Sequence, residues 1–398
     1  MSNSQMKITD DIFYVGVQDR TKTRFESLWT LTKGVSYNAY LIVDEKVALI
    51  DTVEVDFFPQ FIESIKDILG DRPIDYLVIN HMEPDHSSSI SLIRQFYPEV
   101  KLVGNKKTFD MVQGFYEACR EDDVEVANGG ELCLGRHTLN FAYVPMLHWP
   151  ETMVTFETTT GTLFSGDAFG CFGALNGGVF DHEMDLEMYY AEMERYYACI
   201  LGKYSAPVQT ALKKLSGLPI KTICSTHGPV WTGERVAEVI DRYDKLSKGD
   251  FKEGVVICYG SMYGNAQSVA EAIAQGVVKA GVKKVIVHNL TISDPSEVLA
   301  DIYRYRGLAI GGPTYNGDVY PAVKELLNRL AGRDVKNHKL AIFGGWTWAG
   351  AAVKVITGYE ELLKMERIGE PLEWKQTARR EVLEQARSLG QQLGEAVK

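Results

Sequence analysis

An apolar run in the first quarter of the chain ends abruptly at a group of potential metal ligands. Residues 74–79 are rich in branched apolar side chains, which is typical of a strand covered on both faces. The sequence His81-Met-Glu83-Pro-Asp85-His86 follows at once. In an extended backbone, side chains two residues apart project to the same side, so these ligands converge without a helix. Alone, the stretch also fits a polar turn with incidental histidines, but it predicts a buried strand that delivers a metal site.

Three further potential ligands stand where regular structure is expected to end. His148 lies in a turn between two prolines, Asp167 follows a strand over 162–165, and His227 follows a strand over 221–225. Each residue alone also fits an ordinary turn. Ligand types at several separate strand ends rarely coincide by chance, so together with the first group they indicate one metal site.

Composition narrows the class of protein. A chain of 398 residues is expected to form at least two domains. Its 42 basic and 53 acidic residues give a net charge of −11 without long runs of one sign, which argues against nucleic acid or an anionic membrane as partner. With no leader-like start and no membrane-length apolar run, we expect a cytoplasmic protein. The six cysteines contain no CxxC pair and are expected to be reduced and mostly buried.

The order of the expected elements divides the chain in two. Up to about residue 251, β-rich and mixed segments alternate, as in two half-domains packed as a sandwich with outer helices. From residue 255, strands and helices alternate strictly, and five or fewer strands predict a doubly wound parallel sheet. We therefore expect domains of 1–251 and 252–398.

Three loops of the second part stand at the carboxyl ends of its expected strands, where doubly wound sheets bind ligands. The first, 259–266, contains no Lys or Arg, so its backbone N–H groups and hydroxyls suit a terminal phosphate rather than a triphosphate. The loops 311–317 and 344–350 add glycines and flat aromatic side chains suited to a flavin ring. The aromatic residues also fit a simple core, but glycines on both sides of them favour a binding loop.

Together these loops resemble flavodoxin over residues 253–398, which implies bound FMN. The third loop departs from the glycine-rich pattern of many relatives, and of its two tryptophans the second aligns better with the flavin-facing position. The resemblance implies cofactor contacts from Ser261, Met262, Tyr263, Gly264, Asn265, Ala266, Pro313, Thr314, Tyr315, Asn316, Gly317, Gly345, Trp346, Thr347, Trp348 and Ala349.

The ligand set and its spacing resemble the metallo-β-lactamase-like domain of the flavodiiron proteins, also called A-type flavoproteins. Hydrolases of the wider superfamily carry HxHxDH, and here Glu83 replaces the second histidine. Zinc favours histidine and cysteine, whereas added carboxylate oxygens suit iron. The three carboxylates of the set also match the charge of two ferrous ions once a hydroxide bridges them. The resemblance implies an N-terminal metallo-β-lactamase-like αββα sandwich followed by a C-terminal flavodoxin-like domain.

The same resemblance assigns roles to the ligands of two non-haem Fe ions. One iron, near the flavin, would be held by His81, Glu83 and His148. The other would be held by Asp85 and His227, with Asp167 as the bridge between them. Family members differ on whether the residue at His86 reaches the metal. Tyr197 is a possible hydrogen-bond donor behind the ligands, and Phe25 and Glu26 stand where some members carry a histidine.

The family reduces nitric oxide, dioxygen or both, and the sequence leaves that choice open. Because no CxxC pair is present, the resemblance implies a separate soluble rubredoxin-like electron donor. It also implies a head-to-tail homodimer or a dimer of dimers. Two alternatives are a dinuclear zinc hydrolase with an accessory flavodoxin module, which Glu83 disfavours, and an electron-transfer protein with a vestigial metal site, which the complete ligand set disfavours.

Overall fold

The computed structural model describes residues 6–333 and 335–398. Residues 1–5, which include the start of the chain where we expected no leader, lie outside the described residues. The chain divides into two compact units, one of Met1–Tyr196 with Ala206–Asp244 and one of Tyr197–Ser205 with Lys245–Lys398. The domain boundary expected after residue 251 stays a prediction.

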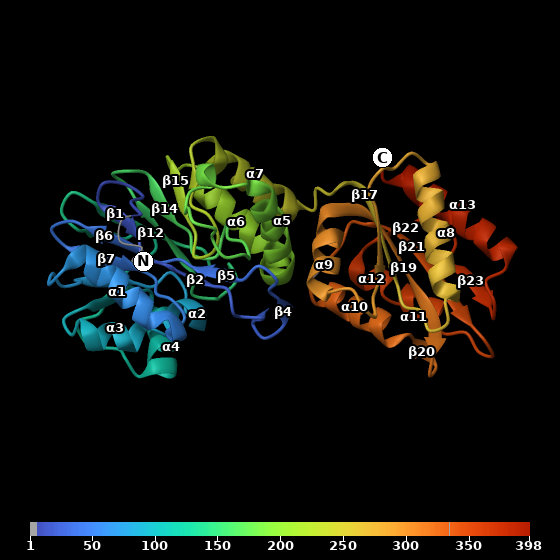
Figure 1. Cartoon of the computed structure of the whole chain (residues 1–398), viewed down its shortest axis with the longest axis horizontal. Coiled ribbons are helices and arrows are strands. Elements are labelled where there is room, and N and C mark those ends of the chain that lie inside the picture. The colour runs from blue at the N-terminus through green and yellow to red at the C-terminus, as the bar shows by residue number, and fades with distance from the viewer. Residues whose placement is uncertain (1–5, 334) are drawn as a thin grey trace. The chain divides into compact units, whose positions relative to one another are not determined.

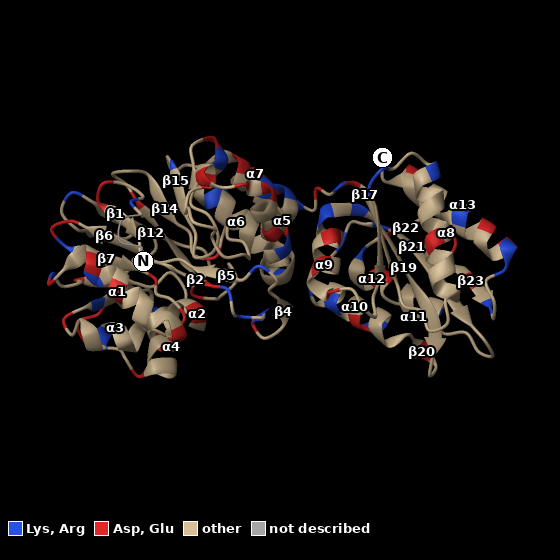
Figure 2. Cartoon of the chain, in the orientation of Figure 1, with Lys and Arg blue, Asp and Glu red and all other residues tan. Residues whose placement is uncertain are grey.

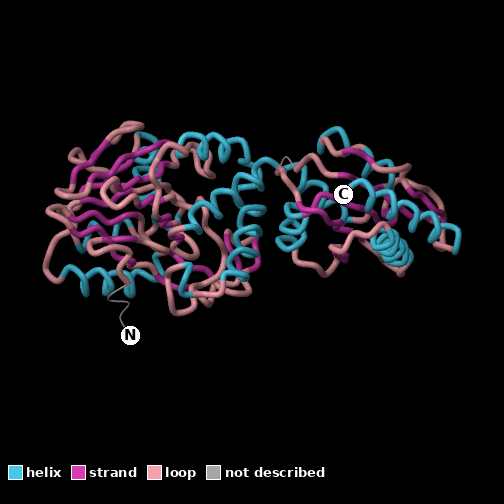
Figure 3. The backbone as a smooth tube through the Cα atoms, turned by 90° about the horizontal axis from the view of Figure 1, so that it is seen from above, coloured by secondary structure: helices cyan, strands magenta, loops and turns pink. Residues whose placement is uncertain are grey.

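Two six-stranded sheets form the core of the N-terminal unit, as Figure 3 shows in magenta. The first has the order β1 (Ile12–Tyr14), β6 (Tyr40–Val43), β7 (Val47–Ile50), β8 (Tyr76–Val78), β9 (Lys101–Gly104) and β10 (Val124–Glu125). The second has the order β11 (Glu131–Cys133), β12 (Thr138–Tyr143), β13 (Met153–Glu157), β14 (Thr162–Phe164), β15 (Thr222–Cys224) and β16 (Trp231–Thr232). Every residue of β7 and β13 is buried, as expected for strands covered on both faces.

Helices cover the outer faces of both sheets (Figure 1). One group lies along the side of the first sheet: α1 (Phe58–Leu69), α2 (Pro84–Ser87), α3 (Ile90–Phe96) and α4 (Lys106–Tyr116). The other lies along the second sheet: α5 (Leu186–Tyr196), α6 (Ser205–Leu215) and α7 (Glu234–Lys248). Helix α1 buries Phe61 and Ile65, four residues apart, so a single apolar stripe attaches it to the core.

Short elements complete this unit. Strands β2 (Val17–Asp19) and β5 (Val35–Tyr37) pair with each other, as do β3 (Arg24–Phe25) and β4 (Trp29–Thr30). Single turns stand at η1 (Val55–Phe57) and η2 (Asp181–Glu183). The π-helical turn η3 (Tyr197–Leu201) and the single turn η4 (Gly202–Tyr204), which follow α5, belong to the second unit. The early hairpins are too short for an alternating pattern to announce them.

The ends of several strands point to one place between the two sheets. Strands β14 and β15 are parallel, and β12 runs in their direction because both β12 and β14 are antiparallel to β13. In the first sheet, β7 and β8 are parallel. Since parallel strands end at the same edge of a sheet, the loops that follow β8, β12, β14 and β15 can bring their side chains together.

A mostly parallel sheet forms the core of the second unit. Its main order is β18 (Val285–Asn289), β17 (Lys252–Tyr259), β19 (Tyr305–Tyr315), β21 (Lys339–Trp346) and β22 (Glu366–Arg367), with β20 (Asp318–Val319) on β19 and β23 (Leu372–Lys375) on β21. The expectation of five or fewer strands was wrong, because this sheet has seven. The additional strands span only two to four residues each, which is too short for a clear pattern.

The helices around this sheet are α8 (Asn265–Lys279), α9 (Pro295–Arg304), α10 (Pro321–Gly332), α11 (Ala352–Thr357), α12 (Glu360–Leu363) and α13 (Arg380–Ala396). Helices α8 and α13 approach closely through two glycines. A Cβ atom on Gly276 would lie 2.0 Å from the Arg387 carbonyl oxygen, and one on Gly390 would lie 2.0 Å from the Ile273 carbonyl oxygen. Any larger residue at either position would force these helices apart.

Charged side chains of both signs are interspersed over the outer helices of each unit (Figure 2). Within residues 6–333 and 335–398, none of the helices has the length and apolar content needed to cross a membrane. Four of the six cysteines, Cys171, Cys199, Cys224 and Cys258, are buried.

Candidate metal centre

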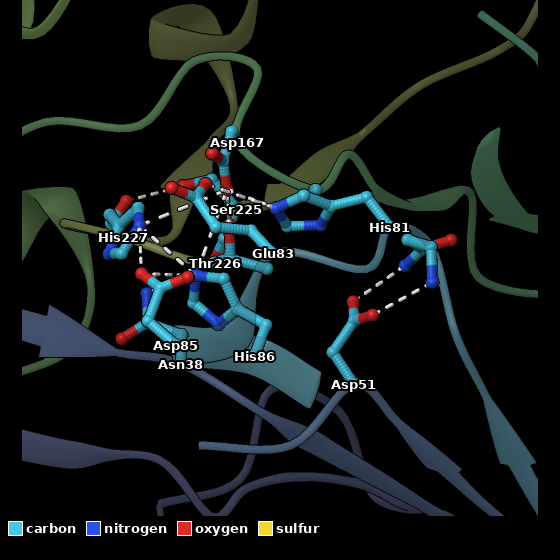
Figure 4. Close-up of polar contacts among 12 residues, drawn as sticks. Asn38, Asp51, His81, Glu83, Asp85, His86, Asp167, Ser225, Thr226 and His227 are labelled. Atoms are coloured by element: carbon cyan, nitrogen blue, oxygen red, sulfur yellow. Dashed lines mark hydrogen bonds and ion pairs between the residues drawn. The ribbon is translucent and has the colours of Figure 1, made fainter. Parts of the chain in front are cut away.

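The seven potential metal ligands identified in the sequence lie in two adjoining groups between the sheets. Within each group, one ligand atom from every residue lies within 4.8 Å of the others. Figure 4 shows the side chains from the β8, β14 and β15 loops turned toward one another. The first group is His81, Glu83, His148 and Asp167, and the second is Asp85, His86 and His227. All of them are at most 9% exposed.

Asp167 stands between the two groups. Its Oδ1 atom lies 3.3, 3.7 and 3.8 Å from the Nε2 atoms of His81, His86 and His227, respectively. Its Oδ2 atom lies 2.9 Å from His148 Nε2. One carboxylate thus faces ligands of both groups, which is the placement that a residue bridging two metal ions requires.

Each group also has a carboxylate of its own. Glu83 Oε2 lies 2.8 Å from His148 Nε2 in the first group. In the second, Asp85 Oδ2 lies 3.3 Å from His86 Nε2 and 3.4 Å from His227 Nε2, and the two imidazole nitrogens are 3.0 Å apart. Two histidine nitrogens at this distance share one proton or face a common cation. The structure therefore places His86 within the second group, and its role as a ligand stays a prediction.

The protonation of the group reflects its density of carboxylates. Burial would lower the pKa of His81, but Asp167 and Glu83 hold it well above its usual value. In the same way Glu83 and Asp167 outweigh burial and raise the pKa of His148 to about 10. Burial and the neighbouring His227 instead hold the pKa of His86 well below its usual range. Protons on histidines thus balance the carboxylates, and metal ions would take their place.

Neighbouring polar groups fix the orientation of the ligands. Asp167 Oδ1 accepts a hydrogen bond of 2.6 Å from the Thr226 hydroxyl, and Asp167 Oδ2 accepts one of 2.7 Å from the Tyr196 hydroxyl. His227 Nδ1 lies 2.7 Å from the Ser36 carbonyl oxygen, which leaves Nε2 free to face a metal. Such second partners set ring orientation and tautomer in metal sites.

The hydrogen bond to a ligand that we expected from Tyr197 comes from its neighbour Tyr196. The Tyr197 hydroxyl lies 3.0 Å from Ser205 Oγ, whereas the preceding Tyr196 reaches Asp167. Successive residues of a helix point about 100° apart, so only one of two adjacent tyrosines can face the centre. The sequence holds no signal that chooses between them.

Two further residues near the centre, Asp51 and Asn38, were not predicted from the sequence. Asp51, at the end of β7, accepts two hydrogen bonds of 2.8 Å from the backbone and side chain of Asn80, and so braces the start of the ligand loop (Figure 4). Asn38 Nδ2 donates to the carbonyl oxygens of Ser225 and Gly228 on either side of His227. Asn38 directly follows β5 and Asp51 directly follows β7. A polar residue at such a strand end was the sequence signal that could have identified them.

The donors present fit a pair of iron ions. Both carboxylate oxygens of Asp85, both ring nitrogens of His81 and Nδ1 of His86 are buried and form no hydrogen bond with any residue that the structure describes. Buried polar atoms without partners are costly unless a ligand satisfies them. The three carboxylates of the set, Glu83, Asp85 and Asp167, add oxygen donors that favour iron over the histidine- and cysteine-rich sites of zinc.

A separate cavity of about 830 Å³ opens in the second unit at the carboxyl ends of β17, β19 and β21. Every residue of the expected FMN-binding set lines it except Gly264, which lies in the same loop and donates to Ser261 Oγ. Gly350, Ala351, Trp374 and Gln376 also line it and were not expected. The volume is typical of a small-molecule site.

The loops around this cavity suit a flavin phosphate and ring. Helix α8 begins at Asn265 without a capping side chain on Gly264, so its first backbone N–H groups face the loop. Thr314 Oγ1 accepts hydrogen bonds from the backbone of Ala351 and Ala352 and so ties the second loop to the third. Trp346 is half-buried and Trp348 is 89% exposed, and both line the cavity.

Comparison with known proteins matches both units. Residues 35–228 match the family described as ODP family beta lactamase, and residues 257–390 match Flavodoxin. A nitric oxide reductase of Moorella thermoacetica is 33% identical over 392 residues, which cover 97% of each chain. The chain belongs to the flavodiiron proteins. An anaerobic nitric oxide reductase flavorubredoxin of Vibrio vulnificus is 33% identical over 87% of this chain and 71% of its own.

Solved structures agree with this family. The rubredoxin oxygen:oxidoreductase of Desulfovibrio gigas superposes with a TM-score of 0.94 at 26% identity, covering 98% of both chains. The flavodiiron protein of Giardia intestinalis gives a TM-score of 0.92 at 29% identity over 98% and 96% of the two chains. This flavodiiron protein is therefore an oxidoreductase whose cofactors are FMN and two non-haem irons.

Proposed function

We propose that this flavodiiron protein reduces nitric oxide to nitrous oxide. The observation that carries the proposal is the pair of ligand groups that share Asp167, in a chain that also holds a flavin-sized cavity. Two relatives at 33% identity bear nitric oxide reductase names. When bound, the iron pair binds and reduces the diatomic molecule, and FMN supplies the electrons.

The protein's own residues hold and orient these groups. In this proposal His81, Glu83 and His148 would hold one iron, Asp85 and His227 would hold the other, and Asp167 would bridge them. The Tyr196 and Thr226 hydroxyls fix the plane of the Asp167 carboxylate. Burial of every ligand keeps bulk water away from the reacting atoms.

Dioxygen is the second candidate substrate. The close superposition on the rubredoxin oxygen:oxidoreductase of Desulfovibrio gigas favours it. The test is to reduce the purified protein chemically under anaerobic conditions and to follow nitric oxide with an electrode and dioxygen in a parallel experiment. Rapid consumption of nitric oxide with formation of nitrous oxide supports the first proposal, and consumption of dioxygen alone would replace it with the second.

Metal content separates these reductases from a zinc hydrolase. We expect two irons per chain after anaerobic purification, because the ligand set is rich in carboxylate oxygen. Two zinc ions per chain, with hydrolase activity and no reduction of either gas, would contradict the proposal.

The second domain is proposed to begin at residue 252 and to bind FMN on its own. Both the cavity and its three loops lie within residues 252–398. A fragment of this length should be yellow and should release FMN when denatured. A colourless fragment, or one that releases FAD, would contradict this assignment.

We also propose a soluble rubredoxin-like electron donor, a head-to-tail homodimer or a dimer of dimers, and a cytoplasmic location. The name of the Desulfovibrio gigas protein supports the donor. Reduction of the flavin by added reduced rubredoxin, followed in a stopped-flow spectrometer, tests the donor. Mass measurement in solution tests the dimer and tetramer.

A further inference from the structure

One glutamate side chain joins two of the loops that carry the first ligand group. Glu151 stands three residues after His148, in the loop between β12 and β13 of the second sheet. Its Oε1 atom accepts a hydrogen bond of 2.8 Å from the backbone N–H of Met82, in the loop that follows β8 of the first sheet. The bond therefore connects ligand loops that come from different sheets.

Met82 stands between two proposed ligands of the same iron. His81 precedes it and Glu83 follows it, and all three lie outside any helix or strand. A movement of the Met82 backbone would therefore displace both ligand side chains. The Ser87 hydroxyl donates a hydrogen bond of 2.9 Å to the Met82 carbonyl oxygen. Side chains thus bind both polar groups of this peptide backbone, where a neighbouring strand would do so in a sheet.

The contact between Glu151 and Met82 is shielded from water. Glu151 is 2% exposed and Met82 is fully buried. A buried backbone N–H that loses its acceptor cannot bond to water instead, so the loss is costly. Removal of the Glu151 carboxylate would therefore favour a displaced ligand loop over the one observed.

Glu151 is itself held in place. The side chain of Asn105 donates a hydrogen bond of 2.6 Å to the Glu151 carbonyl oxygen. The Asn105 Oδ1 atom accepts hydrogen bonds from the backbone of Lys107 and Thr108 at the start of α4. The backbone of Glu151 is thereby attached to a helix end, which lets its side chain act as a fixed support for Met82.

Other residues hold the loops of the second ligand group. Asn38 bonds to the carbonyl oxygens on either side of His227. The Thr52 hydroxyl donates a hydrogen bond of 2.6 Å to the His86 carbonyl oxygen. Loss of Glu151 should therefore disturb the ligands of the first iron more than those of the second.

The contact with Met82 uses one oxygen of the Glu151 carboxylate. The other oxygen, Oε2, is buried and forms no hydrogen bond with any residue that the structure describes. Holding Met82 requires an acceptor at the end of a side chain of this length, and it does not require a negative charge. Glutamine has both the length and the acceptor.

We propose that Glu151 is a positioning residue for the first iron. Its hydrogen bond to Met82 sets the distance of His81 and Glu83 from His148, so that the three side chains meet at one metal ion. This inference rests on the ligands named in the proposed function.

The test measures iron binding to full-length, FMN-loaded protein from which the metal has been removed by a chelator. Anaerobic titration with ferrous iron gives the affinity of each site, and Mössbauer spectra of bound ⁵⁷Fe distinguish the two irons. Glu151→Ala should weaken one of the two irons by about 10–100-fold, because residues that orient metal ligands typically contribute this much. The other iron should bind about as tightly as in wild type.

Two milder substitutions separate the hydrogen bond from the charge. Glu151→Gln keeps the acceptor and removes the charge, so it should bind both irons about as well as wild type. Glu151→Asp keeps the charge but is one CH₂ group shorter, so it should lose affinity for the same iron as Glu151→Ala. This pair decides the question even if the alanine variant does not fold.

Glu157→Ala is the matched control. Glu157 is fully buried and accepts backbone hydrogen bonds of 2.7 and 2.8 Å from Thr159 and Thr160. It lies at the opposite end of β13 from the ligand loop. Its removal also deprives buried backbone groups of an acceptor, but both irons should bind as in wild type.

Each outcome bears on one claim. A wild-type protein that takes up no pair of irons would contradict the proposed function. If the wild type binds two irons and Glu151→Ala binds both equally well, the role of Glu151 alone is overturned. Equal weakening of both irons, or a loss in Glu151→Gln as large as in Glu151→Ala, likewise overturns it, because the first indicates a general structural role and the second a role of charge.

Discussion

The Tyr196 hydroxyl donates a hydrogen bond of 2.7 Å to Oδ2 of Asp167, the one carboxylate that faces both ligand groups. Thr226 binds the other oxygen of the same carboxylate. Two hydroxyls from different elements therefore fix its plane before any metal is bound. Partners of this kind typically contribute 10–100-fold to metal affinity or activity.

Tyr196→Phe should therefore weaken iron binding or lower the rate of gas reduction by about 10–100-fold. The aromatic ring remains to pack against Phe172, so the fold should be kept. Iron per chain and rate per iron are the measurements. Tyr197→Phe is the matched control, because the Tyr197 hydroxyl lies 3.0 Å from Ser205 Oγ. Equal effects of the two substitutions would contradict the role given to Tyr196.

Glu83→His should shift the metal content from iron toward zinc and abolish the reductase activity. The substitution exchanges a carboxylate 2.8 Å from His148 for an imidazole, which gives the first group the histidine-rich character of zinc sites. Metal analysis after growth with both metals measures the shift. Unchanged iron occupancy and activity would show that Glu83 does not select the metal.

The metal-free protein should lose stability as pH rises because His148 releases a proton. Its pKa is raised to about 10 by Glu83 and Asp167 against the opposing effect of burial, compared with about 6.5 for an unfolded histidine. A raised pKa stabilises the folded state fully below pH 6.5, and this contribution disappears as pH rises through about 10.

Unfolding by denaturant after chelation checks this pH dependence. The difference in unfolding free energy between wild type and His148→Gln should shrink steadily from pH 6 to pH 10. The same substitution at His182, whose side chain is exposed, serves as control. A difference that stays constant over this range would mean that His148 is neutral in the metal-free protein.

The ligands could be placed from the sequence because each follows an expected strand, and parallel strands end at a common edge. His81, Asp167 and His227 are of this kind. The residues that orient these side chains could not be predicted from the sequence, because their role depends on which face of a helix or loop they occupy. Tyr196 and Tyr197 are adjacent and chemically identical, and only the rotation of α5 decides which one meets Asp167.

In the flavin cavity, too, some lining residues could be predicted from the sequence and others could not. Its glycine- and aromatic-rich loops were visible because loops after parallel strands bind ligands. Trp374, which also lines the cavity, was not visible because it lies in β23, a four-residue strand of alternating burial. Such a short strand becomes stable only through its pairing with β21, a contact distant in sequence.

Thr314→Val should weaken FMN binding. The Thr314 hydroxyl accepts hydrogen bonds of 2.9 and 3.1 Å from the backbone of Ala351 and Ala352, and valine keeps the shape while removing this acceptor. Leaving such donors unsatisfied costs about 1–3 kcal/mol. Titration of the flavin-free protein with FMN measures the loss. Thr291→Val, at an exposed position of the same unit outside the cavity, is the control and should bind FMN as well as wild type.

Two inactive variants should restore activity to each other if the working unit is the proposed head-to-tail dimer. His227→Ala removes a proposed ligand of the second iron, and combined substitution of Asn265 and Thr314 removes proposed flavin contacts. In a two-fold dimer the flavin of one subunit serves the iron pair of the other, so a mixed dimer keeps one intact pair. Random assortment makes half of the dimers mixed, each with one of two pairs intact, which gives about a quarter of wild-type activity. Co-expression with two different affinity tags isolates the mixed dimers. Inactive mixed dimers would mean that electrons pass within one chain and that the head-to-tail arrangement is wrong.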